Sequence, residues 1–91
     1  MQVRAAIERK LTQALTPQHL DVIDDSGQHV GHAGHKPGGE THFRIRVVSA
    51  AFAGKSRVER HRIVNALLAD ELAGPVHALQ LATLTPDEAA R

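Results

Sequence analysis

The sequence predicts a small α+β domain in which a three-stranded mixed sheet carries its helices on one face. Three observations lead to this prediction. The 91 residues suffice for one modest core. Two longer segments have the apolar spacing of helices, and three shorter ones have that of strands. The order helix, strand, strand, helix, strand, short helix inserts a helix between the second and third strands, which makes those two strands parallel.

The first helix is expected over residues 2–15. Val3, Ile7 and Leu11 recur at helical intervals and so share one face. The helix should end at Thr16, because the following Pro17 disfavours helical geometry in the residue before it.

Two strands should follow, at residues 19–24 and 42–49. The second strand alternates most clearly, with Phe43, Ile45 and Val47 on its inward face. The link between the strands is rich in glycine and much longer than the roughly 2–5 residues usual for a hairpin. Links of this length are often functional or mobile.

A turn over residues 50–55 should lead into the second helix. Ser56 and Glu59 form a capping-box pattern at its start. The apolar spacing continues to Leu72, and Gly74 with the proline after it should end the helix.

The third strand is expected over residues 78–83, with Leu79 and Leu81 on one face. Thr85 then repeats the cap pattern with a proline after it, which predicts a last turn of helix. With strands one and two antiparallel and strands two and three parallel, the long link and the start of strand three lie at the same end of the sheet. His77 opens strand three and is therefore expected beside the link.

Composition narrows the function classes. A formal net charge of +1 argues against a chain that is a nucleic-acid or membrane binder over its whole surface. Cysteine is absent, so any metal must be held through histidine or carboxylate. The start of the chain lacks the apolar core of a signal peptide, and no apolar run reaches the ~18 residues of a membrane span. We expect a soluble cytoplasmic protein without membrane partners. No nucleophile with a base and an orienting group is evident, so an enzyme is not expected.

Histidines gather at the predicted end of the sheet. Up to five could approach one another there: His29, His32, His35, His42 and His77. Neutral imidazole is a common ligand of zinc, copper and iron. The alternative is that the histidines of the link are solvated and that His77 only closes a strand edge, because HxxH in a loop is a weak motif.

Five segments resemble the BolA family: DDSGQH, GGETHF, RVVSAAFAGKS, RHRIVNALLADEL and VHALQL. They include the motifs ETHF (Glu40 to Phe43), FxGxSxxxRH (Phe52 to His61) and HAL (His77 to Leu79), and they cover nearly the whole chain. The resemblance implies one domain over residues 1–91 with a fold like type II KH domains. The implied order is α-β-β-α-α-β, with an additional short helix in place of the turn at residues 50–55.

The resemblance also implies a partner and a cofactor. BolA-like proteins pair with monothiol glutaredoxins and help to traffic or insert [2Fe–2S] clusters, which they share with the glutaredoxin and its glutathione and do not hold alone. It places the C-terminal ligand on His77 and the loop ligand on His29. His32 and then His35 are the alternatives for the loop ligand. An adaptor that docks glutaredoxin without binding iron stays open, as does a homodimer of the free chain.

The alternative function is a DNA-binding transcriptional regulator. Family members have been proposed to bind DNA through the turn and helix at residues 50–72, where four basic residues gather: Lys55, Arg57, Arg60 and Arg62. The loop at residues 53–56 lacks the second glycine of a KH clamp, and the sheet offers few aromatic rings on which bases could stack. The competing interpretation is a solvated helix face with one structural ion pair, to Glu59 or Asp70.

Overall fold

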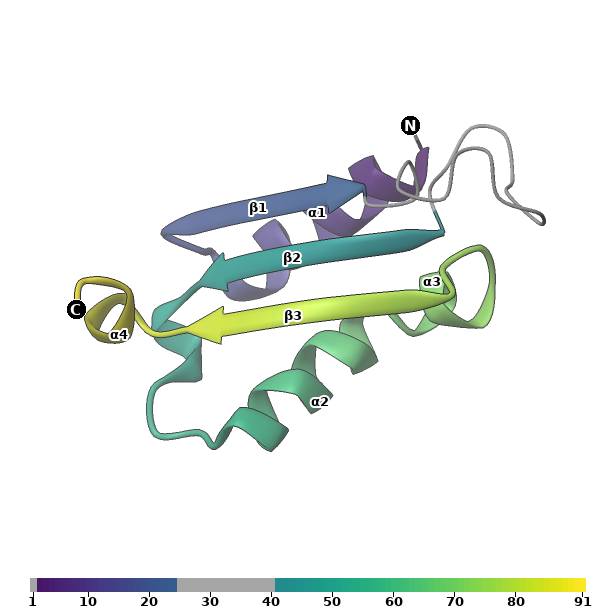
Figure 1. The fold of residues 1–91 in the computed structure, drawn as a ribbon. Coiled ribbons are helices and arrows are strands. Elements are labelled where there is room, and N and C mark those ends of the chain that lie inside the picture. The colour runs from purple at the N-terminus through teal and green to yellow at the C-terminus, as the bar shows by residue number, and fades with distance from the viewer. Residues whose placement is uncertain (1, 25–40) are drawn as a thin grey trace.

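The computed structural model describes residues 2–24 and 41–91, and it confirms the α+β class with its three-stranded mixed sheet. The elements in chain order are α1 (Gln2–Leu15), β1 (His19–Asp24), β2 (His42–Val48), the 3-10 turn η2 (Ala50–Phe52), α2 (Arg57–Leu67), α3 (Ala69–Ala73), β3 (Ala78–Leu84) and α4 (Pro86–Ala89) (Figure 1).

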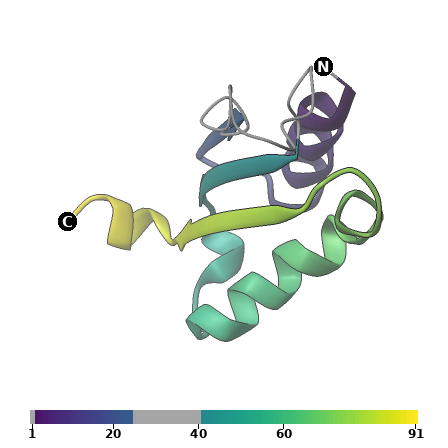
Figure 2. The ribbon, with the colours of Figure 1, turned by 45° about the vertical axis from the view of Figure 1, so that its right-hand side comes forward.

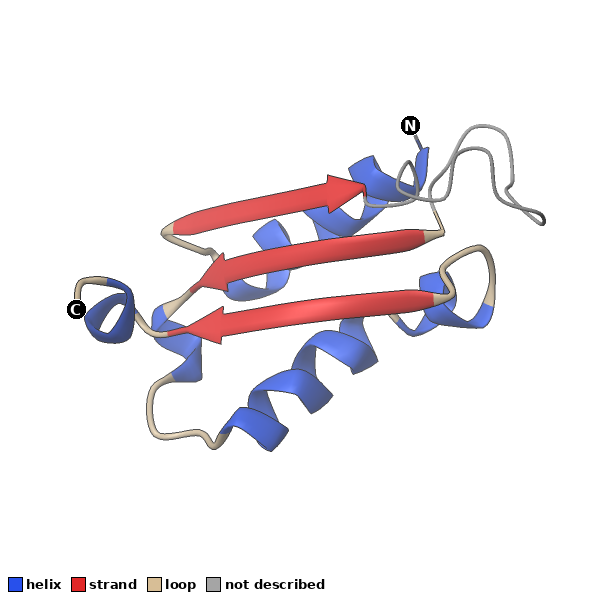
Figure 3. Cartoon of the chain, viewed as in Figure 1, coloured by secondary structure: helices blue, strands red, loops and turns tan. Residues whose placement is uncertain are grey.

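The sheet has the order β1-β2-β3, with β1 antiparallel to β2 and β2 parallel to β3, as predicted. Ile45 in the central strand lies opposite Val22 on one side and Leu81 on the other. Helix α1 lies behind β1 and β2, and α2 runs along the β3 side (Figure 3). Helix α4 projects from the end of the sheet opposite the starts of β2 and β3 (Figure 2).

The core lies between one face of the sheet and helices α1 and α2. The inward residues of β2 are buried, as the alternation predicted, while Arg44 and Arg46 are exposed on the other face. Full burial of one such apolar side chain contributes about 1.5–3 kcal/mol. The buried apolar cluster consists of Ile7, Leu11, Leu15, Val22, Phe43, Ile45, Val47, Phe52, Val64, Leu68 and Val76.

The region between β2 and β3 differs from the prediction in two details. The turn after β2 contains η2, whose Phe52 is buried, so the short helix implied by the resemblance is present as a three-residue 3-10 turn. The single helix expected to reach Leu72 is divided at Leu68, whose φ and ψ are −104° and 21°. Leu68 is fully buried, and its apolar spacing is the same in one helix or two, so the pattern could not show the break.

Two buried polar side chains in this frame are in opposite situations. The Ser49 hydroxyl donates to the Leu15 carbonyl at the end of α1 (2.7 Å) and accepts from the Ala51 amide (3.1 Å). The Thr83 hydroxyl has no hydrogen-bond partner among the residues that the structure describes. Ser49 therefore supplies a donor to a helix carbonyl that would otherwise lack one. Thr83 buries a hydroxyl that makes no hydrogen bond with the described residues, which is unfavourable.

We expect Ser49→Ala to lower the free energy of unfolding by about 1–3 kcal/mol, because it leaves a buried carbonyl without its donor. Thr83→Val keeps the shape of the side chain and removes the unpaired hydroxyl, so it should raise that free energy by about 1 kcal/mol. Urea unfolding of both variants measures these differences. Equal losses in the two variants would contradict the assignment.

Candidate functional site

His77 lies where the strand topology placed it, immediately before β3. Its backbone N–H donates to the carbonyl of Thr41 at 2.7 Å, and the next amide, of Ala78, lies 3.3 Å from the same oxygen. Thr41 immediately precedes β2, and Asp24 at the end of β1 lies opposite Phe43. The end of β1, the start of β2 and His77 are therefore at one end of the sheet, as predicted.

His42 is the described histidine that lies next to His77. The two ring centroids are 6.1 Å apart, and the ring planes are inclined at 30°. The His77 side chain is exposed and that of His42 is partly buried. The Nδ1 atom of His42 lies 2.9 Å from Thr41 Oγ1, a contact that orients its ring.

The predicted loop ligands His29, His32 and His35 lie outside the described residues. Residues 24 and 41, which flank that part of the chain, both lie at the end of the sheet where His77 is found. In the described ranges 2–24 and 41–91, no group of three or more His, Cys, Asp or Glu side chains could hold a metal ion. At this end of the sheet, the described residues bring together two imidazole rings, those of His42 and His77.

An ion pair between α1 and α3 fixes the turn that leads into His77. Lys10 Nζ binds both carboxylate oxygens of Glu71, at 2.9 and 2.8 Å. Burial raises the pKa of the Glu71 carboxyl, but the hydrogen bonds from Lys10 and from the Glu71 backbone amide, with the positive charges of Lys10 and Arg9, together outweigh this effect, and the pKa lies below its ordinary value. The Glu71 carbonyl accepts from the amides of Gly74 and Val76, and Val76 is buried. The backbone just before His77 is therefore anchored to α1.

The four basic residues around the start of α2 do not form one surface. Lys55, Arg57 and Arg62 are exposed, whereas the side chain of Arg60 is only 12% exposed. The loop before the helix turns at Gly54, whose φ of 76° favours glycine. Three of the four residues predicted for a nucleic-acid surface are thus available to a partner.

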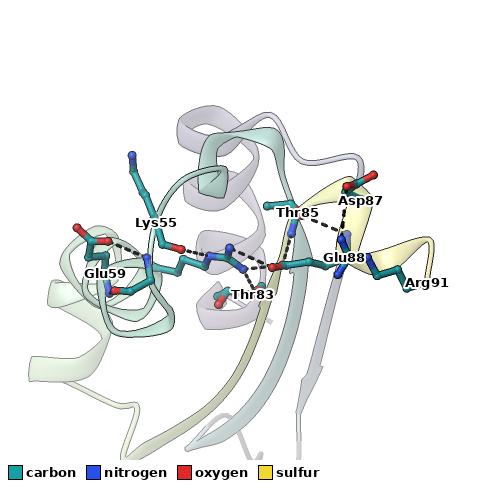
Figure 4. Close-up of polar contacts among 9 residues, drawn as sticks. Lys55, Glu59, Thr83, Thr85, Asp87, Glu88 and Arg91 are labelled. Carbon is teal, nitrogen blue, oxygen red and sulfur yellow. Dashed lines mark hydrogen bonds and ion pairs between the residues drawn. The ribbon is translucent and has the colours of Figure 1, made fainter.

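Arg60 connects four parts of the structure, and Figure 4 labels three of its partners, Lys55, Thr83 and Glu88. Its Nε donates to the Lys55 carbonyl at 2.9 Å, and Nη1 donates to the Thr83 carbonyl at 3.0 Å. Nη1 and Nη2 also donate to the two carboxylate oxygens of Glu88, at 2.6 and 3.2 Å. The guanidinium carbon lies 6.0 Å from the centre of the Phe52 ring. Arg60 therefore joins η2, α2, β3 and α4.

A structural ion pair was predicted for these arginines, but its predicted partners were wrong. Glu59 completes the capping box with Ser56, and Asp70 lies 3.9 Å from Lys10. The partner of Arg60 is Glu88, which stands three residues after Thr85, at the acidic position of the capping box that begins the last helix. Glu88 does form that capping box, so one carboxylate serves the cap and the ion pair together.

Comparison with known proteins decides the family. A family model described as "BolA-like protein" matches residues 11–88. The chain belongs to the BolA family.

Relatives within the BolA family agree with this assignment. BolA-like protein 1 of Pongo abelii is 55% identical over 84 residues, which cover 92% of this chain and 58% of that protein. The chain therefore spans less than two thirds of that relative. A Vibrio cholerae protein named "DNA-binding transcriptional regulator BolA" is 45% identical over 87 residues, which cover 94% of this chain and 77% of that protein.

A solved BolA structure confirms the fold. The BolA domain of SufE1 from Arabidopsis thaliana superimposes with a TM-score of 0.82 at 48% sequence identity, covering 93% of each chain. None of the helices described for this BolA chain is long and apolar enough to span a lipid bilayer.

The Arg60–Glu88 pair predicts a dependence of stability on pH. The Arg60 guanidinium, together with the Thr85 amide, lowers the pKa of Glu88 from 4.5 to about 2. A carboxyl whose pKa is lower in the folded chain stabilises it above the unfolded pKa, and this contribution is lost as the pH falls through the folded pKa. The stabilisation should therefore be complete above about pH 5 and should disappear towards about pH 2.

Glu88→Gln removes the titrating group, so the difference in stability between wild type and this variant should shrink as the pH falls over that range. Urea unfolding at a series of pH values measures it. Asp87→Asn is the matched control, because Asp87 is 90% exposed and lies 3.8 Å from Arg91 in a surface pair, which should contribute little. A difference between Glu88→Gln and wild type that does not vary with pH would contradict the role given to this pair.

Proposed function

We propose that this chain pairs with a monothiol glutaredoxin and supplies histidine ligands to a [2Fe–2S] cluster that the two proteins share with glutathione. The observation that supports this proposal is the position of His77. Its exposed imidazole stands at the end of the sheet where both flanks of the histidine-rich residues 25–40 lie. In this proposal His77 is one ligand and His29 is the other, with His32 and then His35 as alternatives.

The donor set fits a shared cluster. The sequence contains no cysteine, so thiolates have to come from the partner and from glutathione. Imidazole nitrogen can replace thiolate on one iron of a [2Fe–2S] cluster, as in Rieske centres, and this raises the reduction potential. The described residues of this chain offer too few donors to enclose the cluster, which is consistent with a site completed by a second protein.

The surroundings of His77 suit a ligand that a partner must reach. The side chain is exposed, while the backbone on both sides of it is fixed by the contacts of Glu71 and Thr41. A rigid backbone limits the conformational entropy lost when the imidazole binds, and exposure lets the cluster approach from the partner's side. The chain itself then orients a neutral nitrogen donor and leaves the thiolate chemistry to the glutaredoxin.

The test is anaerobic, iron-replete co-purification with a monothiol glutaredoxin, followed by visible circular dichroism. His77→Ala should change the spectrum and reduce the cluster retained, and His29→Ala should do the same. His61→Ala is the matched control, because His61 is half-buried on α2 and should leave the spectrum unchanged. A wild-type spectrum in both His77→Ala and His29→Ala would refute the ligand assignment.

Binding to glutaredoxin without a cluster separates ligation from docking. If His77 only ligates the cluster, His77→Ala should bind apo-glutaredoxin with an affinity close to that of wild type, measured by calorimetry, and should still lose the cluster. Retention of both the binding and the cluster would instead indicate an adaptor that docks glutaredoxin without contributing a ligand.

The second candidate is direct DNA binding. It is favoured by the name of the Vibrio cholerae relative and by the exposure of Lys55, Arg57 and Arg62 around the start of α2. Arg60 is left out of this surface, since its guanidinium is bound to Glu88 and Thr83.

If these residues contact phosphates, each alanine substitution should reduce the slope of log affinity against log salt by about 0.9. We therefore expect Lys55→Ala with Arg57→Ala to weaken DNA binding and to reduce its salt dependence, as measured by fluorescence anisotropy on duplex DNA. Arg9→Ala on α1 removes an exposed charge elsewhere and should act less. Equal effects of the two changes would argue against a surface at α2.

A further inference from the structure

Helices α1 and α2 pack on one face of the sheet, and none of the described helices lies in front of the other face (Figure 3). Because side chains alternate along a strand, this uncovered face carries five exposed residues from all three strands. They are Asp21 and Ile23 of β1, Arg46 of β2, and Gln80 and Ala82 of β3. Together these five residues form the open face.

A hollow of about 350 Å³ lies on the open face. The register of the sheet explains it, because the long side chain of Arg46 lies opposite Ala82, whose side chain is a single methyl group. Ile23 also lines the hollow, and it is one of the two large apolar side chains that the described residues leave exposed, at 48%. The hollow therefore combines aliphatic surface with a guanidinium.

The Arg46 side chain makes no ion pair with any residue that the structure describes. The register places Asp21 directly opposite Arg46, where a cross-strand ion pair would form. The Asp21 carboxylate instead lies 2.8 Å from Nε2 of His19. Arg44 also lines the hollow, but it has an interaction of its own within the chain. Arg46 is therefore the cation that a ligand can engage.

A carboxylate beside an aliphatic group matches this hollow. The guanidinium of Arg46 can donate two parallel hydrogen bonds to a carboxylate, and the amide of Gln80 on the next strand is a further donor. The aliphatic group would cover Ile23 and Ala82. Sites for small molecules usually bury roughly 70–90% of the ligand, which a hollow on an uncovered sheet does not. A segment of polypeptide, which buries further surface around the hollow, is the better occupant.

We propose that the open face docks an acidic segment of a partner protein, with its carboxylate on Arg46 and its aliphatic side chains on Ile23 and Ala82. A nucleic acid is a poorer match, because the open face includes the carboxylate of Asp21 and has no aromatic ring on which a base could stack. None of these residues is a ligand in the proposed cluster site, so this inference does not depend on the glutaredoxin complex.

The test is titration of the full isotope-labelled chain with an acetylated and amidated peptide, Glu-Ser-Leu-Ser-Glu-Ser-Leu, followed by NMR of the backbone amides. In an extended peptide, the Glu and Leu side chains share one face. We expect shifts at the amides of Ile23, Arg46 and Ala82. Arg46→Gln should weaken binding about tenfold, as expected for one lost hydrogen bond to a charged group. Arg9→Gln removes an exposed charge on α1 and should leave the affinity unchanged.

A second variant tests the hollow itself. Ala82→Glu places a carboxylate opposite Arg46 within the chain and fills the hollow, so binding should be lost. Ala5→Glu adds the same charge at an exposed position on α1 and should retain binding. The same spectra report whether each variant is folded.

The proposal is overturned if the peptide causes no shifts on the open face of the wild-type chain, or if Arg46→Gln binds the peptide as tightly as wild type. Two other results would also overturn it. Shifts caused by oligodeoxythymidine and not by the peptide would assign the open face to nucleic acid. Shifts on this face that appear when the chain alone is diluted would assign it to a second copy of the chain.

Discussion

The parallel pairing of β2 with β3 is the contact on which the rest of the structure depends. A parallel pair cannot be closed by a hairpin, so the chain must leave one end of the sheet after β2 and return to the other end before β3. Helices α2 and α3 make this return, and α2 together with α1 covers the inward face of the sheet. The same pairing places His77 against Thr41 at one end, and it places the Thr83 carbonyl within reach of Arg60 at the other.

The two ends of the sheet differ in how they treat polar side chains. At the α4 end, the charge of Arg60 is matched by Glu88, and both groups are committed to structure. At the other end, an exposed imidazole stands on a backbone that is fixed by Thr41 and Glu71. The guanidinium of Arg60 therefore stabilises the fold at the α4 end. At the other end, the exposed imidazole of His77 can contact a partner or a ligand.

Most of the fold could be predicted from local pattern. The alternation of Phe43, Ile45 and Val47 defined the central strand, and strand order alone placed His77 beside the ends of β1 and β2. Capping patterns located the start of α2 and α4. These features could be predicted because each depends on residues that are close together in the chain.

The contacts that local pattern missed join distant residues. Arg60 and Glu88 are 28 positions apart, and Lys10 and Glu71 are 61 positions apart, so no periodicity connects them. The break at Leu68 was also hidden, since the helical spacing of apolar residues runs through it. Each base has an acid closer in the sequence, Glu8 for Lys10 and Glu59 for Arg60. The packing of the helices and strands determines that the ion pairs form with Glu71 and Glu88.

The ladder between β1 and β2 closes the chain across residues 25–40, and its register is set by pairs such as Val22 with Ile45 inside the core. That ladder, and the bonds from the amides of His77 and Ala78 to the Thr41 carbonyl, are made by residues outside 25–40. Exchanging a histidine in that part of the chain should therefore change the set of possible ligands and leave the strand end that presents His77 in place.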